Sequence, residues 1–141
     1  MQKITPFLWL DGKAEEAMNF YVSIFKYSKI LGANRFRLEG QEFLVLNGGP
    51  QFTFTPAVSF FINCETQEEV DELWEKLSAG GEKGRCGWLK DKYGLSWQVI
   101  PSILGKLLHD KDPAKAKRVM NAMLQMNKIG IKGLQQAYDQ A

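Results

Sequence analysis

The sequence is poor in the residues that most often bind transition metals or form disulfides. It contains one histidine, His109, and two cysteines, Cys64 and Cys86, which form no Cys-x-x-Cys pair. The N-terminus shows neither the apolar segment nor the cleavage site of a secretory signal. We therefore expect free thiols and a reducing, cytoplasmic location. His109 follows the apolar ILGKLL segment and is expected to be a polar residue near a helix C-terminus.

Long apolar runs and a strong charge of one sign are also missing. No apolar run approaches the roughly 18 residues that a membrane-spanning helix requires. The chain has 18 Lys and Arg residues against 16 Asp and Glu, and these charges are interspersed. The pattern disfavours both a membrane and a nucleic acid as partner. With 141 residues, of which 45% are hydrophobic, the chain has the size and composition of one globular domain.

The sequence does contain an internal repeat of strand and helix patterns. Residues 4–10, ITPFLWL, predict a strand, and Asp11 is expected to cap a helix with apolar positions at helical spacing. Residues 58–64, VSFFINC, predict a second strand, and Thr66 with Glu69 forms a capping-box pattern before the next helix.

The spacing between these patterns is nearly constant. Thr66 follows Asp11 by 55 positions, and the turn glycine Gly94 follows Gly40 by 54. Strand, cap, helix and hairpin therefore match in the same order, which predicts a duplicated strand–helix–strands module.

We expect an α+β fold built from these modules. Residues 1–50 and 51–101 each predict a βαβββ-type module, residues 102–141 predict a helical tail, and the three parts together form one domain with a cupped mixed sheet. In the tail, Asp112 is the expected helix cap before Pro113, and an apolar, Met-rich stripe follows. Such a stripe is typical of a core or dimer contact.

Each helix covers one face of its sheet, so the other faces are expected to line a cup. With Gln98 facing inward, Trp97 and Val99 face a helix, because strand side chains alternate. The same alternation gives the expected lining, with Trp88 at its rim: Ile4, Pro6, Leu8, Leu44, Leu46, Ser59, Phe61, Asn63, Ser96, Gln98 and Ile100. A mostly apolar lining with a few amides and hydroxyls suits an uncharged or weakly polar small ligand.

Several of these residues have a second, purely structural interpretation. Gln98 and Asn63 could contact a ligand or could bridge strands or bind water. Trp88 could stack on a ligand or fill the rim. Both interpretations remain open at this stage.

Other chemistries have little support in the sequence. Asp91 and Glu82 are expected to be surface-turn carboxylates without a catalytic partner. Cys86 follows Arg85 but has no evident partner base, so an inert thiol is expected. The glycine pairs at 48–49 and 80–81 are typical of a strand exit and a helix end, and not of a phosphate loop.

Several segments together resemble a known family. These segments are ITPFLWLDGKAEEAMNFYVSIF, FLVLNGGP, CETQEEVDELWEKLSAGGE, CGWLKDKYGLSWQVIP and, in the tail, RVMNAMLQM. They are similar to the PhnB-like branch of the vicinal oxygen chelate superfamily, which includes glyoxalase I, bleomycin resistance proteins and extradiol dioxygenases. Members of this branch are often labelled 3-demethylubiquinone methyltransferase-like, although no glycine-rich nucleotide loop is present here. The usual pattern of the branch implies that one strand is missing between Ile30 and Phe36, so the first module is expected to be shortened.

The resemblance also implies where a metal would bind. Enzymes of the superfamily hold a divalent metal with four His or Glu side chains, two from each module. Matching the motifs places these positions at Ile4, Leu44, Ser59 and Gln98. None of the four is His, Glu, Asp or Cys, so we expect no metal and no other cofactor.

Three functions remain possible. The first, which we favour, is a metal-free protein that binds or sequesters a small molecule, as the resistance proteins of the superfamily do. The second is an enzyme of the superfamily, of lyase, isomerase, dioxygenase or methyltransferase type, with unrecognised catalytic residues. The third is a structural domain whose cup is closed by its own dimer. A homodimer is expected in any case, because a shortened module would leave a sheet edge and apolar surface uncovered.

Overall fold

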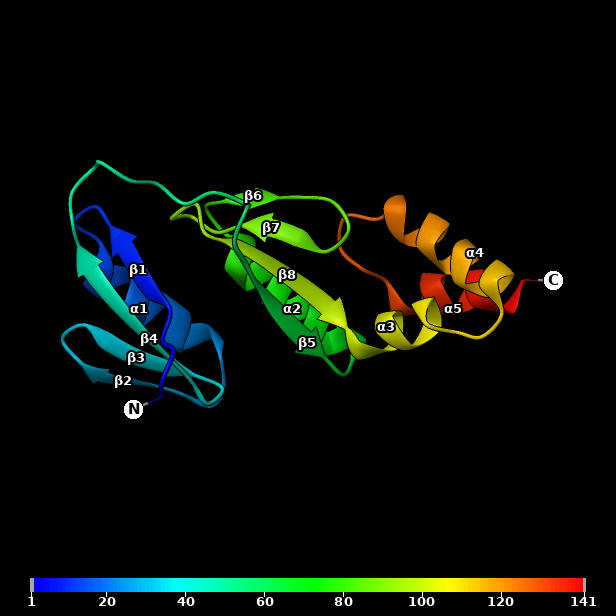
Figure 1. Ribbon diagram of the computed structural model, residues 1–141, viewed down its shortest axis with the longest axis horizontal. Helices are drawn as coiled ribbons and strands as arrows, with labels where there is room; N and C mark the ends of the chain where they lie inside the picture. The colour runs from blue at the N-terminus through cyan, green and yellow to red at the C-terminus, as the bar shows by residue number, and fades with distance from the viewer. Residues whose placement is uncertain (1, 141) are drawn as a thin grey trace. The chain divides into compact units, whose positions relative to one another are not determined.

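A computed structural model of the protein describes residues 2–140. The chain divides into two units, Met1–Phe54 and Thr55–Ala141, and Figure 1 shows the elements of each. The first unit is a single βαβββ module composed of β1 (Phe7–Leu10), α1 (Ala14–Ile24), β2 (Ser28–Gly32), β3 (Arg35–Leu38) and β4 (Gln41–Asn47).

The strands of the first unit form one mixed sheet in the order β1-β4-β3-β2. β1 pairs with β4 in parallel, and the other two pairs are antiparallel. The core lies between the sheet and α1, where the Tyr21 ring stacks on Phe36 and Phe36 stacks on Phe43, with centroid distances of 6.0 and 5.0 Å. These stacked rings form an aromatic part of the core between helix and sheet.

The start of α1 differs from the sequence prediction. Asp11 was expected to cap the helix, but the N-cap residue is Lys13, whose side chain makes no capping bond. Instead, the Asn47 Oδ1 atom accepts a hydrogen bond from the Ala14 backbone N–H at 2.8 Å. A side chain at the end of β4 therefore supplies the cap, and no local sequence pattern could reveal this long-range partner.

The prediction that the first module lacks a strand is wrong. β2 and β3 both form between residues 28 and 38, and a register shift lies between Ile30 and Gly32. Only Ala33 and Asn34 separate the two strands, and a hairpin can close over a two-residue turn. The segment therefore has room for two strands.

The second unit begins with a module of the same topology. It contains β5 (Ser59–Cys64), α2 (Gln67–Ser78), β6 (Glu82–Lys83), β7 (Trp88–Lys90) and β8 (Ser96–Pro101), with strand order β5-β8-β7-β6. In the parallel pairs, Phe7 aligns with Leu44 and Phe61 aligns with Gln98. The repeat and the α+β fold predicted from the sequence are confirmed, and each module forms a four-stranded mixed sheet of its own.

The elements of the second module follow its local sequence signals. The Thr66 side chain accepts a hydrogen bond from the Glu69 backbone N–H at 3.1 Å, as its cap position predicts. The Glu69 carboxylate accepts from the Glu65 backbone N–H at 2.8 Å, one residue before the usual capping-box partner. On α2, the buried stripe is Val70, Leu73, Trp74, Leu77 and Ser78.

Three helices follow the second module and pack against it: α3 (Ser102–Leu108), α4 (Pro113–Leu124) and α5 (Ile131–Asp139). Asp112 caps α4 through a 2.9 Å bond from Ala114 N–H, as predicted. The three helices share a core with the end of β8, formed by the buried residues Ile100, Leu104, Leu107, Val119, Ile129 and Leu134. Part of the apolar stripe therefore packs within its own chain, while Met120 and Leu124 stay exposed.

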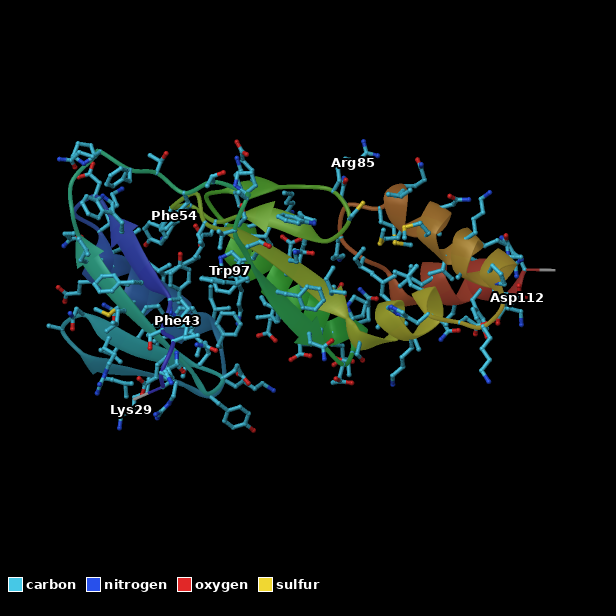
Figure 2. All side chains as sticks on the ribbon, in the orientation of Figure 1. Lys29, Phe43, Phe54, Arg85, Trp97 and Asp112 are labelled. Carbon is cyan, nitrogen blue, oxygen red and sulfur yellow. The ribbon has the colours of Figure 1, made fainter. Side chains whose placement is uncertain are left out.

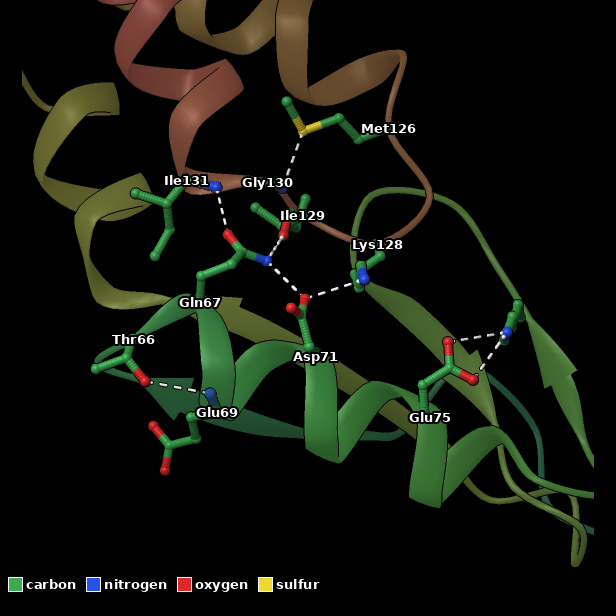
Figure 3. A network of polar contacts seen from close by, with 11 residues as sticks. Thr66, Gln67, Glu69, Asp71, Glu75, Met126, Lys128, Ile129, Gly130 and Ile131 are labelled. Carbon is green, nitrogen blue, oxygen red and sulfur yellow. Dashed lines mark hydrogen bonds and ion pairs between the residues drawn. The ribbon is translucent and has the colours of Figure 1, made fainter.

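Polar contacts fix the segment between α4 and α5 to the module (Figure 3). The Gln67 side chain accepts from Ile131 N–H at 2.7 Å and donates to the Ile129 carbonyl at 3.0 Å. The Asp71 carboxylate accepts from Gln67 at 2.9 Å and pairs with Lys128 at 3.0 Å. Gln67 and Asp71 therefore hold residues 128–131 on α2 through hydrogen bonds to the backbone and through an ion pair.

No helix within residues 2–140 is long and apolar enough to cross a membrane.

Candidate functional site

The face of the second sheet opposite α2 carries the candidate site. Trp97 and Val99 of β8 are buried on the helix side, as strand alternation predicts, and Figure 2 labels Trp97 on its strand. The intervening residues point to the other face. We call this surface the open face of the second sheet. Its members, in strand order, are Ser59, Phe61 and Asn63 on β5, Ser96 and Gln98 on β8, and Trp88 and Lys90 on β7. Ile100, which was predicted to line the same face, is instead buried in the core that β8 shares with the tail helices.

The strand register arranges these residues in rows across the sheet. One row contains Phe61, Gln98 and Trp88, because Gln98 aligns with Phe61 on one side and with Trp88 on the other. Neighbouring side chains in such a row lie close enough to contact one ligand. The row therefore places one amide between two aromatic rings.

Gln98 has a side-chain partner on the neighbouring strand. Its Nε2 atom donates a hydrogen bond to Ser59 Oγ at 3.0 Å. Because this bond uses the amide nitrogen, the carboxamide oxygen of the half-buried Gln98 side chain can still accept a hydrogen bond. Gln98 thus joins β5 to β8 and also presents a polar group on the open face.

The second row contains Ser59, Ser96 and Lys90. Ser96 is buried, at 1% exposure, and its hydroxyl has no hydrogen-bond partner within residues 2–140. The same serine lines a pocket of about 130 Å³. The residues around this pocket are Pro56, Glu82, Lys83, Gly84, Trp88, Leu89, Lys90 and Ser96.

A buried carboxylate fixes the hairpin that carries Trp88, Lys90 and Ser96. Asp91 is 2% exposed, and its Oδ1 atom accepts from the Tyr93 and Leu95 backbone N–H groups at 2.9 and 3.0 Å. Its Oδ2 atom accepts from Trp97 Nε1 at 2.9 Å. The expectation that Asp91 is a surface-turn carboxylate is therefore wrong, because the turn folds its side chain inward against the Trp97 indole.

The other residues considered in the sequence analysis of the second unit lie apart from the pocket. Asn63 and Phe61 are on the open face but exposed, so Asn63 is not a buried bridge between strands.

Cys64 is fully buried, and this burial raises the pKa of its thiol to about 12. The Cys86 Sγ atom contacts the Met123 carbonyl at 3.6 Å. His109 ends α3, where its Nδ1 atom lies 2.7 Å from the Gly105 carbonyl.

In the first unit, the sequence analysis assigned the first strand to the wrong face. Leu44 and Leu46 are half-buried on the face opposite α1, as expected. Leu8, however, aligns with Val45, and both are buried on the helix side. Phe7 and Trp9 align with Leu44 and Leu46 and share their face instead.

A one-residue error in the repeat offset explains this difference. The helix caps suggested an offset of 55, but Phe7 and Phe61 occupy equivalent register positions 54 apart. Carried back along the strand, this offset makes Thr5 the counterpart of Ser59. Ile4 precedes β1 and is 86% exposed. A shift of one residue moves every strand side chain to the other face.

The open face of the first sheet also holds two cationic side chains that the sequence analysis missed. Arg35 aligns with Leu44, and Arg37 aligns with Glu42, so both arginines share the face of Leu44 and Leu46. The alternation in RFRL carries this signal, because its buried positions are Phe36 and Leu38.

The side chains at the four positions where the resemblance implies metal ligands do not fit a divalent metal. With the corrected register these positions hold Thr5, Leu44, Ser59 and Gln98, which supply hydroxyls, an alkyl group and a neutral amide. Zn²⁺ and related ions prefer imidazole, thiolate or carboxylate ligands. Within residues 2–140, no three His, Cys, Asp or Glu side chains come together in a group that could hold a metal ion.

Comparison with known proteins identifies the family. The model of the 3-demethylubiquinone-9 3-methyltransferase family matches two overlapping stretches, residues 2–37 and 31–100. The chain belongs to this family. The match confirms the PhnB-like resemblance drawn from the sequence, but it ends at residue 100, so the tail helices lie outside it. No curated protein matches the chain.

One solved structure supports this family assignment, and two others match at lower identity. The PhnB protein of Bacillus cereus, which carries the 3-demethylubiquinone-9 3-methyltransferase designation, is 41% identical, with a TM-score of 0.67 over 71% of this chain and 99% of that one. Protein PA1353 of Pseudomonas aeruginosa shares the fold at 16% identity, with a TM-score of 0.58 over 72% and 98% of the two chains. A glyoxalase/bleomycin resistance protein of Albidiferax ferrireducens T118 matches at 17% identity and a TM-score of 0.46, covering 68% and 96%.

Proposed function

We propose that this family member is a metal-free protein that binds and sequesters a small molecule on the open face of the second sheet. The observation that carries the proposal is the Gln98–Ser59 hydrogen bond. It joins a neutral amide and a hydroxyl at two positions where enzymes of the superfamily have metal ligands. A neutral amide bonded to a hydroxyl offers none of the imidazole, thiolate or carboxylate ligands that a divalent transition metal prefers.

The neighbouring side chains suit an uncharged or weakly polar ligand. Phe61, at 59% exposure, and Trp88 offer aromatic surface on either side of Gln98. The free carboxamide oxygen of Gln98 can orient a ligand donor between them. Ser59, next to Gln98 on the open face, adds a hydroxyl to the polar groups available to such a ligand.

Catalysis by the same fold is the alternative, and the family description favours methyl transfer. A methyl-transferring enzyme needs a site for its methyl donor. The β1–α1 connection contains a single glycine, Gly12, and so lacks the glycine-rich loop that a nucleotide-type cofactor uses. Binding without catalysis therefore accounts better for the residues present. A structural domain without a ligand is the third possibility.

We also propose a symmetric homodimer in the cytoplasm. Phe7, Phe61, Met120 and Leu124 are each exposed by more than a third, and soluble proteins commonly cover such apolar surface with a partner. The two cysteines are free thiols, which suits a reducing compartment. Light scattering at micromolar concentration tests the dimer. A mass that stays at 16.0 kDa as the protein is concentrated would contradict it.

Two measurements test the proposed function. Elemental analysis of purified protein, followed by titration with Zn²⁺, Ni²⁺, Mn²⁺ and Fe²⁺, should find no stoichiometric metal. A thermal-shift screen of small molecules should find ligands whose binding weakens in Gln98→Leu. A transition metal held by protein side chains would contradict the proposal, and so would a screen without a single ligand.

A further inference from the structure

The pocket beside Trp88 combines a polar atom without a partner and a free cation. Ser96 Oγ is buried and accepts or donates no hydrogen bond within the described residues 2–140. A buried hydroxyl left unpaired destabilises a protein, because it loses its bonds to water and gains none in return. The pocket that Ser96 lines offers the place where a ligand could supply the missing bond.

Lys90 supplies a positive charge at this pocket. It aligns with Ser96 across β7 and β8, and no hydrogen bond or ion pair joins its ammonium group to residues 2–140. Lys83, which also lines the pocket, is already paired with Glu75 at 3.1 Å. Lys90 is therefore the pocket cation that remains available for an anionic ligand.

The other walls favour a flat apolar group. Trp88 and Pro56 line the pocket, and an indole with a proline ring forms a surface on which an aromatic ring can pack. The volume of about 130 Å³ is close to that of the protein cavities of about 150 Å³ known to hold benzene. The volume therefore suits a single aromatic ring.

We propose that this pocket binds a small aromatic carboxylate, with its ring against Trp88 and Pro56 and its carboxylate accepting hydrogen bonds from Ser96 Oγ and Lys90 Nζ. The inference rests on the proposed function and names a ligand class for it. Glu82 also lines the pocket and aligns with Lys90 without forming an ion pair. Its charge opposes an anion, so removing it should strengthen binding.

Calorimetric titration with benzoate tests the proposal, with benzamide and acetate as probes that lack the charge and the ring. Benzoate should bind in the millimolar range, benzamide about tenfold more weakly, and acetate not measurably, since a charged hydrogen bond contributes about a factor of ten or more. Ser96→Ala and Lys90→Met should each weaken benzoate binding about tenfold. Glu82→Gln should strengthen it severalfold.

Matched variants separate binding from folding. Ser96→Ala should keep or raise the melting temperature while it weakens binding, because it removes an unpaired buried hydroxyl. Ser23→Ala and Lys106→Met change residues outside the pocket and should leave benzoate binding unchanged. In NMR spectra, benzoate should shift the Trp88 indole N–H signal of the wild type.

The proposal is overturned if benzoate fails to bind, or if it binds equally to wild type, Ser96→Ala and Lys90→Met. A screening ligand that Gln98→Leu weakens, but that Ser96→Ala and Lys90→Met do not, would also overturn it. That last result would leave the proposed function standing, so the two failures are distinguishable.

Discussion

Gln98 and Ser59 form a side-chain hydrogen bond of 3.0 Å between the two parallel strands of the second sheet. The pair settles one question that the sequence left open, because Gln98 does bridge two strands. It also leaves the carboxamide oxygen of Gln98 able to accept another bond. A structural and a ligand-binding role are therefore compatible in this residue.

Replacement of Gln98 by leucine separates the two roles. Ser59 is half-buried and can recover a partner from water, so we expect a loss of about 1 kcal/mol in the free energy of unfolding. Ligands found by screening should bind more weakly. Urea unfolding and ligand titration of the same preparations measure both effects. A stability loss above about 3 kcal/mol would instead identify the pair as a structural bridge alone.

Asp91→Asn should destabilise the second unit by about 2–3 kcal/mol. Asp91 accepts two backbone N–H groups on Oδ1 and the Trp97 indole on Oδ2. In the variant, an NH₂ group replaces one of the two carboxylate oxygens. This group faces an N–H donor and cannot accept its hydrogen bond, so at least one buried hydrogen bond is lost. Urea midpoints compared with the exposed control Asp139→Asn check this expectation. Equal midpoints for the two variants would contradict it.

Acid should loosen the attachment of residues 128–131 to α2. Hydrogen bonding from Gln67, followed by the Lys128 ammonium group, lowers the pKa of Asp71. A carboxyl whose folded pKa is depressed stabilises the fold above its unfolded pKa, and this contribution is lost as the pH falls through the folded pKa. We therefore expect Ile131 N–H, which Gln67 holds, to lose hydrogen-exchange protection at acidic pH.

The variant Asp71→Asn provides the comparison for this acid effect. It removes the titrating group, so the protection factor of Ile131 N–H should be lower at neutral pH and change little with acidification. Exchange measured by NMR at several pH values distinguishes the two proteins. The same pH dependence in both would show that another group is responsible.

Removal of the tail helices should expose the core that they share with β8. A chain ending at Pro101 retains Ile100 but lacks Leu104, Leu107, Val119 and the other members of the cluster. Apolar surface left uncovered in this way promotes aggregation. We expect poor solubility, measured as the soluble fraction after expression and centrifugation. A soluble monomer with an unchanged melting temperature would show that the module does not depend on the tail.

The repeat was predictable because its signals are local. Thr66, Gly94 and the alternation of SWQVIP each predict a cap, a turn or a strand from neighbouring residues, and the structure has all three. The placement of Trp97 and Val99 on the helix side followed from the same alternation. Where the sequence determines local geometry, the prediction was confirmed.

The errors in the first module arose where residues distant in the sequence determine the local structure. Asn47 caps α1 from the end of β4, so Asp11 was a misleading marker for the repeat offset. The resulting shift of one residue placed Leu8 on the wrong face. The error at Asp91 has another origin, because its partners Tyr93, Leu95 and Trp97 all lie within six positions of it in the chain. The turn was predicted there, but the burial of its carboxylate was not.

The equal register of the two parallel strand pairs has a consequence for folding kinetics. Residues Phe7 and Leu44 are separated by 37 positions, and so are Phe61 and Gln98. Each parallel pair can form only after a chain loop of this length closes, whereas the antiparallel neighbours of β4 and β8 need much shorter loops. In each module we therefore expect the hairpin strands and the helix to organise early and the first strand to dock last. Because this late strand carries Ser59 in the second module, the Gln98–Ser59 bond reports completion of folding there.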